Sequence, residues 1–115
     1  MQRQHLAGLK MTEPVSFDIR MAALRESFAV RARHDGEELR VLASLVKTDG
    51  AASAQIGVIA HKLAGGAAIF GMPEVSTQAA ALEDAILAGA SQDDIIGKSL
   101  ALVDLLQMNE PDQTA

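Results

Sequence analysis

The chain has 115 residues, of which 49% are hydrophobic and only 3% aromatic, and its formal net charge is −5. This length and apolar content suit one compact domain and exclude a wholly disordered chain. Ten basic residues are outnumbered by fifteen acidic ones, so a nucleic-acid-binding patch is not expected. The absence of cysteine excludes disulfides, thiolate metal sites and cysteine nucleophiles, and it favours a cytoplasmic location.

Four segments between two polar ends have the apolar spacing of amphipathic helices. No stretch keeps the period of two that a half-buried strand requires, and alanine, the strongest helix former, is the commonest residue. Because the connections are short, neighbouring helices are predicted to run antiparallel. We therefore expect an all-α fold, an antiparallel up-down four-helix bundle over residues 16–108. The ends, residues 1–15 and 109–115, are predicted to be flexible. A short extra helix is an alternative for residues 1–15, and the true start is either Met1 or Met11.

The first predicted helix spans residues 16–46. Asp35 and Gly36 fall on its apolar stripe and predict either a kink or a split into two helices. The turn Thr48-Asp49-Gly50 ends it, and Asp49 is the predicted N-cap of the next helix. The stripe consists of Met21, Leu24, Phe28, Ala32, Leu39, Leu42 and Val46.

The other three helices are bounded by glycine, proline and serine. The second spans residues 51–70, the third runs from Pro73 to Gly89, and the fourth follows the N-cap Ser91. No apolar run reaches the roughly 18–20 residues of a membrane span, and no signal peptide is recognised. The predicted core positions are Ile56, Ile59, Leu63, Ala67 and Phe70, then Val75, Ala79, Leu82 and Ile86, then Ile95, Ser99 or Leu100, Leu102, Val103 and Leu106.

The three histidines differ in their surroundings. His5 lies in the N-terminal segment and His34 in a charged stretch, and both are predicted to be solvated. His61 points directly away from the apolar stripe of Ile59 and Leu63, because a helix turns about 100° per residue. It is therefore predicted to be exposed. Five small residues lie within about 60° of it on the same helix face: Ala54, Gly57, Ala64, Gly65 and Ala68.

A docking surface is the predicted role of this face. A solvated face usually carries long charged side chains, yet Lys62 is the only charged residue between Asp49 and Glu74. An uncharged surface of small residues around an exposed histidine is typical of a contact with another protein. The glycines at 65 and 66 lie inside a helix, and close approach of a partner would explain both.

Nucleophilic attack on phosphorus is the chemistry that His61 can perform alone. No histidine or carboxylate lies three or four residues away, so no metal site is expected, and no side chain one turn away suggests a triad. No glycine-rich phosphate loop precedes a helix, so ATP-dependent kinase activity is not expected. An exposed imidazole is substantially neutral at cell pH. His61 is therefore a candidate phosphoacceptor.

The segment Ala60-His-Lys-Leu-Ala-Gly-Gly-Ala-Ala-Ile-Phe-Gly71 resembles the signature of histidine-containing phosphotransfer (HPt) domains. That signature is His, any residue, Leu, Lys, Gly, and a further Gly five or six residues on. The resemblance covers about residues 20–107 and departs at Ala64, where the family usually places the lysine. The matching residues are His61, Leu63, Gly65 and Gly71, with Phe28, Leu39, Leu82 and Glu83 outside the signature.

The resemblance implies a left-handed bundle that carries a phosphoryl group on His61 between receiver-domain aspartates in a multistep two-component phosphorelay. The implied partners are response-regulator receiver domains and a hybrid histidine kinase. Mg²⁺ would be supplied by the receiver, so no cofactor of the chain's own is implied, and a monomer is expected. Lys62 either leans across to the phosphoryl group or contacts the partner or solvent. The predicted phosphoryl-proximal or docking residues are Gly57, Lys62, Ala64, Gly65 and Ala68.

Two other functions remain open. Because Ala64 replaces the family's lysine, the chain could be an HPt-like module that binds receivers or other signalling partners without phosphotransfer. It could also resemble the dimeric, histidine-bearing bundle of a sensor kinase. Detection of phosphohistidine distinguishes the first alternative, and a sizing column distinguishes the second.

Overall fold

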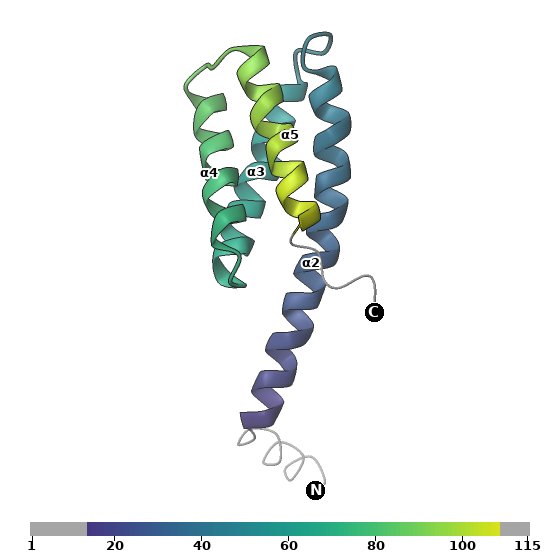
Figure 1. Cartoon of the computed structure of the whole chain (residues 1–115), viewed down its shortest axis with the longest axis vertical. Coiled ribbons are helices and arrows are strands. Elements are labelled where there is room, and N and C mark those ends of the chain that lie inside the picture. Colours follow the sequence, from purple (N-terminus) through teal and green to yellow (C-terminus); the bar gives the residue numbers. More distant parts are fainter. Residues whose placement is uncertain (1–13, 109–115) are drawn as a thin grey trace, which may run out of the picture.

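The computed structural model describes residues 14–108, which form four antiparallel helices packed as a bundle (Figure 1). The predicted all-α bundle is confirmed, and no strand occurs within residues 14–108. The predicted extra helix and flexible ends lie outside the described residues, apart from positions 14 and 15, which belong to the first helix. The helices are α2 (Pro14–Leu45), α3 (Ala52–Ile69), α4 (Pro73–Leu87) and α5 (Gln92–Met108).

The core is formed where the four apolar stripes meet. α2 and α4 each pack against both α3 and α5, so every helix turns one face inward. Ser99 and Leu100 were alternatives for one core position, and Ser99 occupies it, because Ser99 is fully buried whereas Leu100 is 41% exposed. The Ser99 hydroxyl donates to the Ile95 carbonyl at 2.7 Å, which removes the cost of burying it. None of the described helices is long and apolar enough to cross a membrane.

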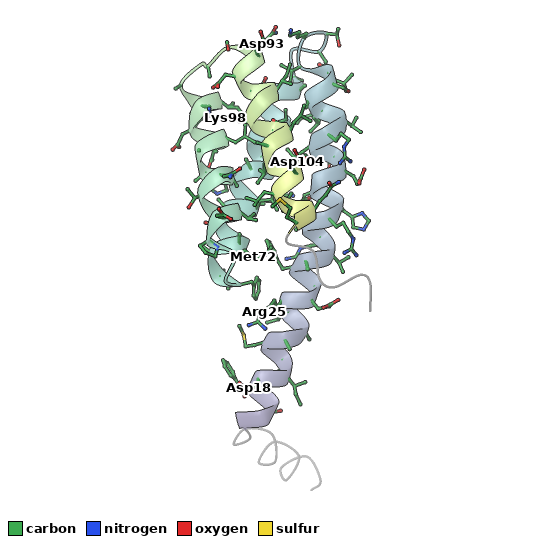
Figure 2. All side chains as sticks on the ribbon, in the orientation of Figure 1. Asp18, Arg25, Met72, Asp93, Lys98 and Asp104 are labelled. Carbon is green, nitrogen blue, oxygen red and sulfur yellow. The ribbon has the colours of Figure 1, made fainter. Side chains whose placement is uncertain are left out.

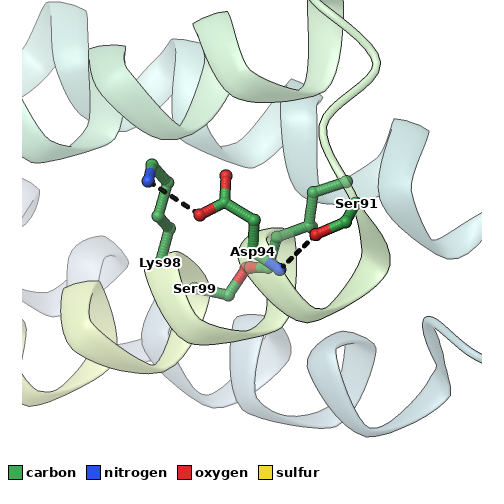
Figure 3. A network of polar contacts seen from close by, with 5 residues as sticks. Ser91, Asp94, Lys98 and Ser99 are labelled. Atoms are coloured by element: carbon green, nitrogen blue, oxygen red, sulfur yellow. Dashed lines mark hydrogen bonds and ion pairs between the residues drawn. The ribbon is translucent and has the colours of Figure 1, made fainter.

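Glycine residues end helices and Ser91 begins α5, as predicted. Asp49, in contrast, is not the N-cap of α3. Gly71 and Gly89 have φ angles of +77° and +75°, a backbone conformation that favours glycine at a helix end. The Ser91 hydroxyl accepts a hydrogen bond from the Asp94 N–H at 3.1 Å, which caps α5 (Figure 3). The N-cap of α3 is Ala51, with no side-chain cap. Asp49 instead accepts a hydrogen bond from the Ala51 N–H at 2.9 Å, because the turn continues two residues further than predicted.

α2 passes unbroken through Asp35 and Gly36, so the split into two helices, one of the two predicted alternatives, does not occur. Gly36 is buried, and a Cβ added there would lie 3.4 Å from the Leu106 side chain. That distance is an ordinary van der Waals contact, so Leu106 of α5 packs directly on this buried position of a continuous helix.

The N-terminal half of α2 extends beyond the other three helices (Figure 1). Phe28 is 4% exposed and belongs to the core, whereas Leu24, one turn earlier, is 52% exposed. The prediction of Leu24 as a core residue is therefore wrong. Its place on the apolar stripe is correct, but no described helix lies against that part of α2.

Candidate functional site

His61 lies in the middle of α3 and projects into solvent, with 74% of its side chain exposed. Ile59 and Leu63, on the opposite face, are buried in the core. The helical geometry that predicted this exposure is confirmed by the burial pattern. An accessible imidazole on a rigid helix is thus the centre of the candidate site.

Glu83 on α4 holds one nitrogen of the His61 ring. The Nδ1 atom lies 2.9 Å from Glu83 Oε2 and 3.2 Å from Oε1, and the Glu83 side chain is only 27% exposed. Because a carboxylate only accepts hydrogen bonds, this contact favours the tautomer with the proton on Nδ1. The Nε2 atom then keeps its lone pair.

The contact between His61 and Glu83 was not predicted, although the sequence contains a signal for it. Each residue stands eleven positions from Met72, in the short α3–α4 connection. In an antiparallel helix pair with a short turn, residues at equal distances from the turn lie at the same height. Leu82, the neighbour of Glu83, is fully buried, and the rotation of α4 that buries it also places Glu83 beside α3.

An apolar groove of about 500 Å³ lies beside His61, between α3 and α4. Its walls include Val58 and Leu87, which are 61% and 78% exposed. An open apolar surface of this kind next to a reactive side chain is typical of a protein-docking site. The groove is lined by Ala54, Gly57, Val58, His61, Lys62, Glu83, Ile86 and Leu87.

Lys62 separates this groove from a charged hollow on the α2 side. The hollow measures about 390 Å³ and is lined by Lys62 together with Phe28, Arg31, His34, Asp35 and Gly66. Burial raises the pKa of Asp35, and the positive charge of Lys62 partly opposes that rise. Lys62 is exposed and lines both hollows. Lys62, Arg31 and His34 therefore gather on this flank. Of these, Lys62 was predicted to be a site residue and His34 to be solvated, and the place of Arg31 was not predicted.

The predicted docking residues do not all lie together. Gly57 lines the groove beside His61, and Gly65 and Ala68 are exposed further along α3. A Cβ added at Gly65 would meet no heavy atom of the described chain within 4 Å. Ala64 differs, because it is half-buried against the core and its carbonyl accepts a hydrogen bond from the Ser76 hydroxyl at 2.9 Å.

Gly66 is half-buried against the Phe28 ring, so its predicted role in partner approach is wrong. A Cβ at this position would overlap the Phe28 ring, whose Cδ1 atom would lie 2.7 Å away. The Phe28 ring also stacks obliquely against Phe70, with 5.5 Å between ring centroids. Gly66 therefore lets α2 approach α3 through an aromatic contact.

The described residues contain no group of three or more histidine, aspartate or glutamate side chains that could hold a metal ion. The His61–Glu83 pair has one ring nitrogen and one carboxylate. This arrangement can orient an imidazole for nucleophilic attack.

Comparison with protein families adds a match that agrees with this geometry. The Hpt domain family model matches residues 23–109, a range that contains the bundle part of α2 and all of α3, α4 and α5. No curated protein and no solved structure matches the chain. Because the family match spans more than half of the sequence, the chain belongs to the Hpt domain family, whose members serve histidine phosphotransfer in phosphorelays.

Proposed function

We propose that this chain carries a phosphoryl group on His61 between the aspartates of receiver domains in a multistep two-component phosphorelay. The observation that carries the proposal is the exposed His61 imidazole whose Nδ1 atom is held by Glu83 at 2.9 Å. That contact orients the ring and leaves Nε2 open to solvent as the nucleophile. Membership of the Hpt domain family supports the same chemistry.

The transfer on this chain involves one bond formed and one bond broken in each direction. The Nε2 lone pair of His61 attacks the phosphorus of a receiver's aspartyl phosphate, and the bond from phosphorus to the aspartate oxygen breaks, which releases a carboxylate. The ring gains positive charge as the N–P bond forms, and the Nδ1 proton stays hydrogen-bonded to Glu83, whose negative charge stabilises it. In the next transfer an aspartate oxygen of a second receiver attacks phosphorus, and the N–P electron pair returns to Nε2.

The surface around His61 fits the docking of a receiver. The apolar groove between α3 and α4 offers exposed Val58 and Leu87 to a partner, and desolvation of such a patch stabilises a complex. Gly65 and Ala68 leave space beside the imidazole. In-line positioning of the two reacting groups is the main requirement of phosphoryl transfer, and a close-fitting docked receiver supplies it.

We assign to Lys62 the role of neutralising the negative charge of the phosphoryl group. The family's usual lysine position is occupied here by Ala64, which is half-buried on the α4 side. Lys62 is exposed and lines the same groove as His61. Its flexible stem can place the ammonium group near phosphoryl oxygens, and it would neutralise part of their charge.

The partners in this proposal are receiver domains and the hybrid kinase that feeds them. The proposal includes a cytoplasmic location, in keeping with a chain that contains no cysteine. It also assigns Mg²⁺ to the receiver rather than to this chain. The residues of the chain bind the receiver, orient the imidazole and hold the Nδ1 proton.

A phosphotransfer assay with a panel of purified receivers tests the proposal. Each receiver is phosphorylated, mixed with the chain in the presence of Mg²⁺, and the chain is then examined for phosphohistidine. We expect labelling of the wild type and no labelling of His61→Ala. His34→Ala is the matched control, because His34 is an exposed histidine on the neighbouring helix, and it should be labelled like the wild type.

Equal labelling of wild type and His61→Ala would contradict the proposal. Binding of a receiver with no phosphohistidine on the wild type would also contradict it. That second result would favour the alternative function, an HPt-like module that binds receivers without phosphotransfer, for which the replacement of the family's lysine by Ala64 is the motivating observation.

A further inference from the structure

The apolar stripe of α2 continues past the end of the bundle without a partner. Phe17, Met21, Leu24 and Phe28 follow one another at steps of four, three and four residues, the spacing of a coiled-coil seam. Phe28 is buried, whereas Leu24 and Phe17 are 52% and 57% exposed. Figure 2 shows Asp18 and Arg25 on this extension, beyond the α3–α4 turn in which Met72 lies. We name residues 14–27 the α2 extension.

Local helix propensity alone does not account for the α2 extension. An isolated helix shorter than about 12–15 residues is marginal in water, because tertiary packing of an apolar face supplies most helix stability. Phe17 and Leu24 are exposed and Met21 is half-buried, and Figure 1 shows this part of α2 extending beyond the other described helices. A surface that continues a core stripe and has coiled-coil spacing is suited to a second helix of the same kind.

We infer that the α2 extension binds the α2 extension of a second copy of this chain, in antiparallel orientation, to form a two-fold symmetric dimer. With the two-fold axis between Met21 and Leu24, Met21 of each copy lies opposite Leu24 of the other. The same patch then serves both subunits, as a symmetric dimer interface requires. The dimer replaces the monomer that the family resemblance led us to expect. It differs from the dimeric bundle of a sensor kinase, because one chain supplies all four helices of the bundle here and the dimer contact lies on the α2 extension, so the Leu24→Glu variant and not dimer size alone separates the two.

The charges beside the seam select the antiparallel orientation. In that orientation Asp18 of one copy lies across from Arg25 of the other, and symmetry repeats this opposite-charge pair at the other end. A parallel pair would instead place Arg20 beside Arg25 of the neighbouring chain, and the two positive charges would repel each other. The complementary charges of Asp18 and Arg25 thus identify a second copy of the chain as the partner that binds the seam of the α2 extension.

The base of the bundle also has space for the end of the second helix. A hollow of about 640 Å³ lies between the α2 extension and the α3–α4 turn, lined by Ala22, Arg25, Glu26, Ala29, Phe70, Gly71 and Met72. In the antiparallel dimer the Phe17 side chain of the second copy arrives at the height of Phe28, next to this hollow. Burial of that aromatic ring adds apolar contact at each end of the interface.

Sedimentation velocity over a wide concentration range tests the dimer. We expect the sedimentation coefficient of the wild type to rise from the monomer value towards the dimer value between about 5 and about 500 µM, because a small interface gives concentration-dependent association. Leu24→Glu should weaken association at least about tenfold. The matched control is Ile19→Glu, since Ile19 is 62% exposed but lies on the face of the helix opposite the seam, and it should associate like the wild type.

A charge exchange tests the orientation. Asp18→Arg places like charges opposite each other and should weaken association several-fold, whereas the double variant Asp18→Arg with Arg25→Asp restores opposite charges and should return association to within about threefold of wild type. A monomer at every concentration would overturn the inference. So would equal effects of Leu24→Glu and Ile19→Glu, or a double variant as weak as the single one. Because His61 lies in the bundle, its labelling by a receiver should be the same in Leu24→Glu and wild type.

Discussion

Gly65 and Gly66 are neighbours in sequence and face opposite environments. A Cβ at Gly65 would enter space that is free of the described residues, while one at Gly66 would overlap the Phe28 ring. One glycine thus belongs to the surface beside His61, and the other belongs to the contact between α2 and α3. The structural role of a small residue inside a helix therefore depends on the element that lies opposite it in the folded protein.

The same contrast separates the two flanks of α3. On the α4 side, His61, Glu83 and the apolar groove form an accessible surface with one fixed ring nitrogen. On the α2 side, Phe28 closes the packing over Gly66, and the charged hollow of Lys62 and Asp35 lies next to it. Substitutions on the α4 side, and at Lys62, which lines both hollows, should change transfer. Substitutions in the contact between Phe28 and Gly66 should change stability.

Among variants that keep His61, the largest effect is expected for Gly65→Glu. The added side chain extends into the space beside His61, so a receiver cannot approach to reacting distance, and the transfer rate should fall at least about 100-fold. Thermal unfolding followed by circular dichroism should show an intact bundle. Gly97→Glu is the matched control, because Gly97 is an α5 glycine with open space around it. Normal transfer by Gly65→Glu would show that the docking surface lies elsewhere.

Glu83→Gln should lower the transfer rate by roughly 10-fold while leaving the fold unchanged. The amide still accepts a hydrogen bond from Nδ1–H, but it lacks the negative charge that stabilises the phosphorylated ring. Nitrogen NMR of His61 should show a larger share of the other tautomer in the variant. Glu74→Gln, an exposed change on the same helix, is the control. An unchanged rate together with unchanged tautomers would remove Glu83 from the mechanism.

The two glycines should respond in opposite directions to alanine. Gly66→Ala forces the Phe28 ring to move and should lower the free energy of unfolding by about 1–3 kcal/mol. Gly65→Ala meets open space and should raise it by about 0.5–1 kcal/mol, because alanine loses less backbone entropy on folding than glycine. Urea titration of both variants measures the difference. Equal changes of one sign would mean that the Phe28 contact does not distinguish the two positions.

The smallest effect is expected for Asp35→Asn. Burial raises the pKa of Asp35 in the folded protein from 3.8, so the ionised form costs stability at neutral pH. That cost is complete above the folded pKa and disappears as the pH falls through it towards the unfolded value. Asp35→Asn should therefore stabilise the protein at pH 7 by less than about 1 kcal/mol, and the gain should vanish near pH 4. Asp104→Asn, an exposed change on α5, controls for net charge. A gain in stability for Asp35→Asn that does not depend on pH would contradict the burial argument.

The four helices, most of their core positions and the exposure of His61 could be predicted from the sequence alone. These features depend on the period of 3.6 residues and on glycine, proline and serine at helix ends, which are local properties of the chain. The sequence also contained the family signature around His61 and Leu63. Bounds differed from the structure by one or two residues, as with Asp49, because a turn can extend without any change in the apolar pattern.

The contacts that each helix face makes depend on the packing of all four helices and could not be predicted from the sequence. Helix rotation and register brought Glu83 to His61, Phe28 to Gly66 and Leu106 to Gly36. The same packing left Leu24 without cover, because the apolar stripe of α2 is longer than the helices beside it. A periodic pattern states which side of a helix is apolar, but the contacts depend on the lengths and rotations of all four helices together, since the core must fill as one unit.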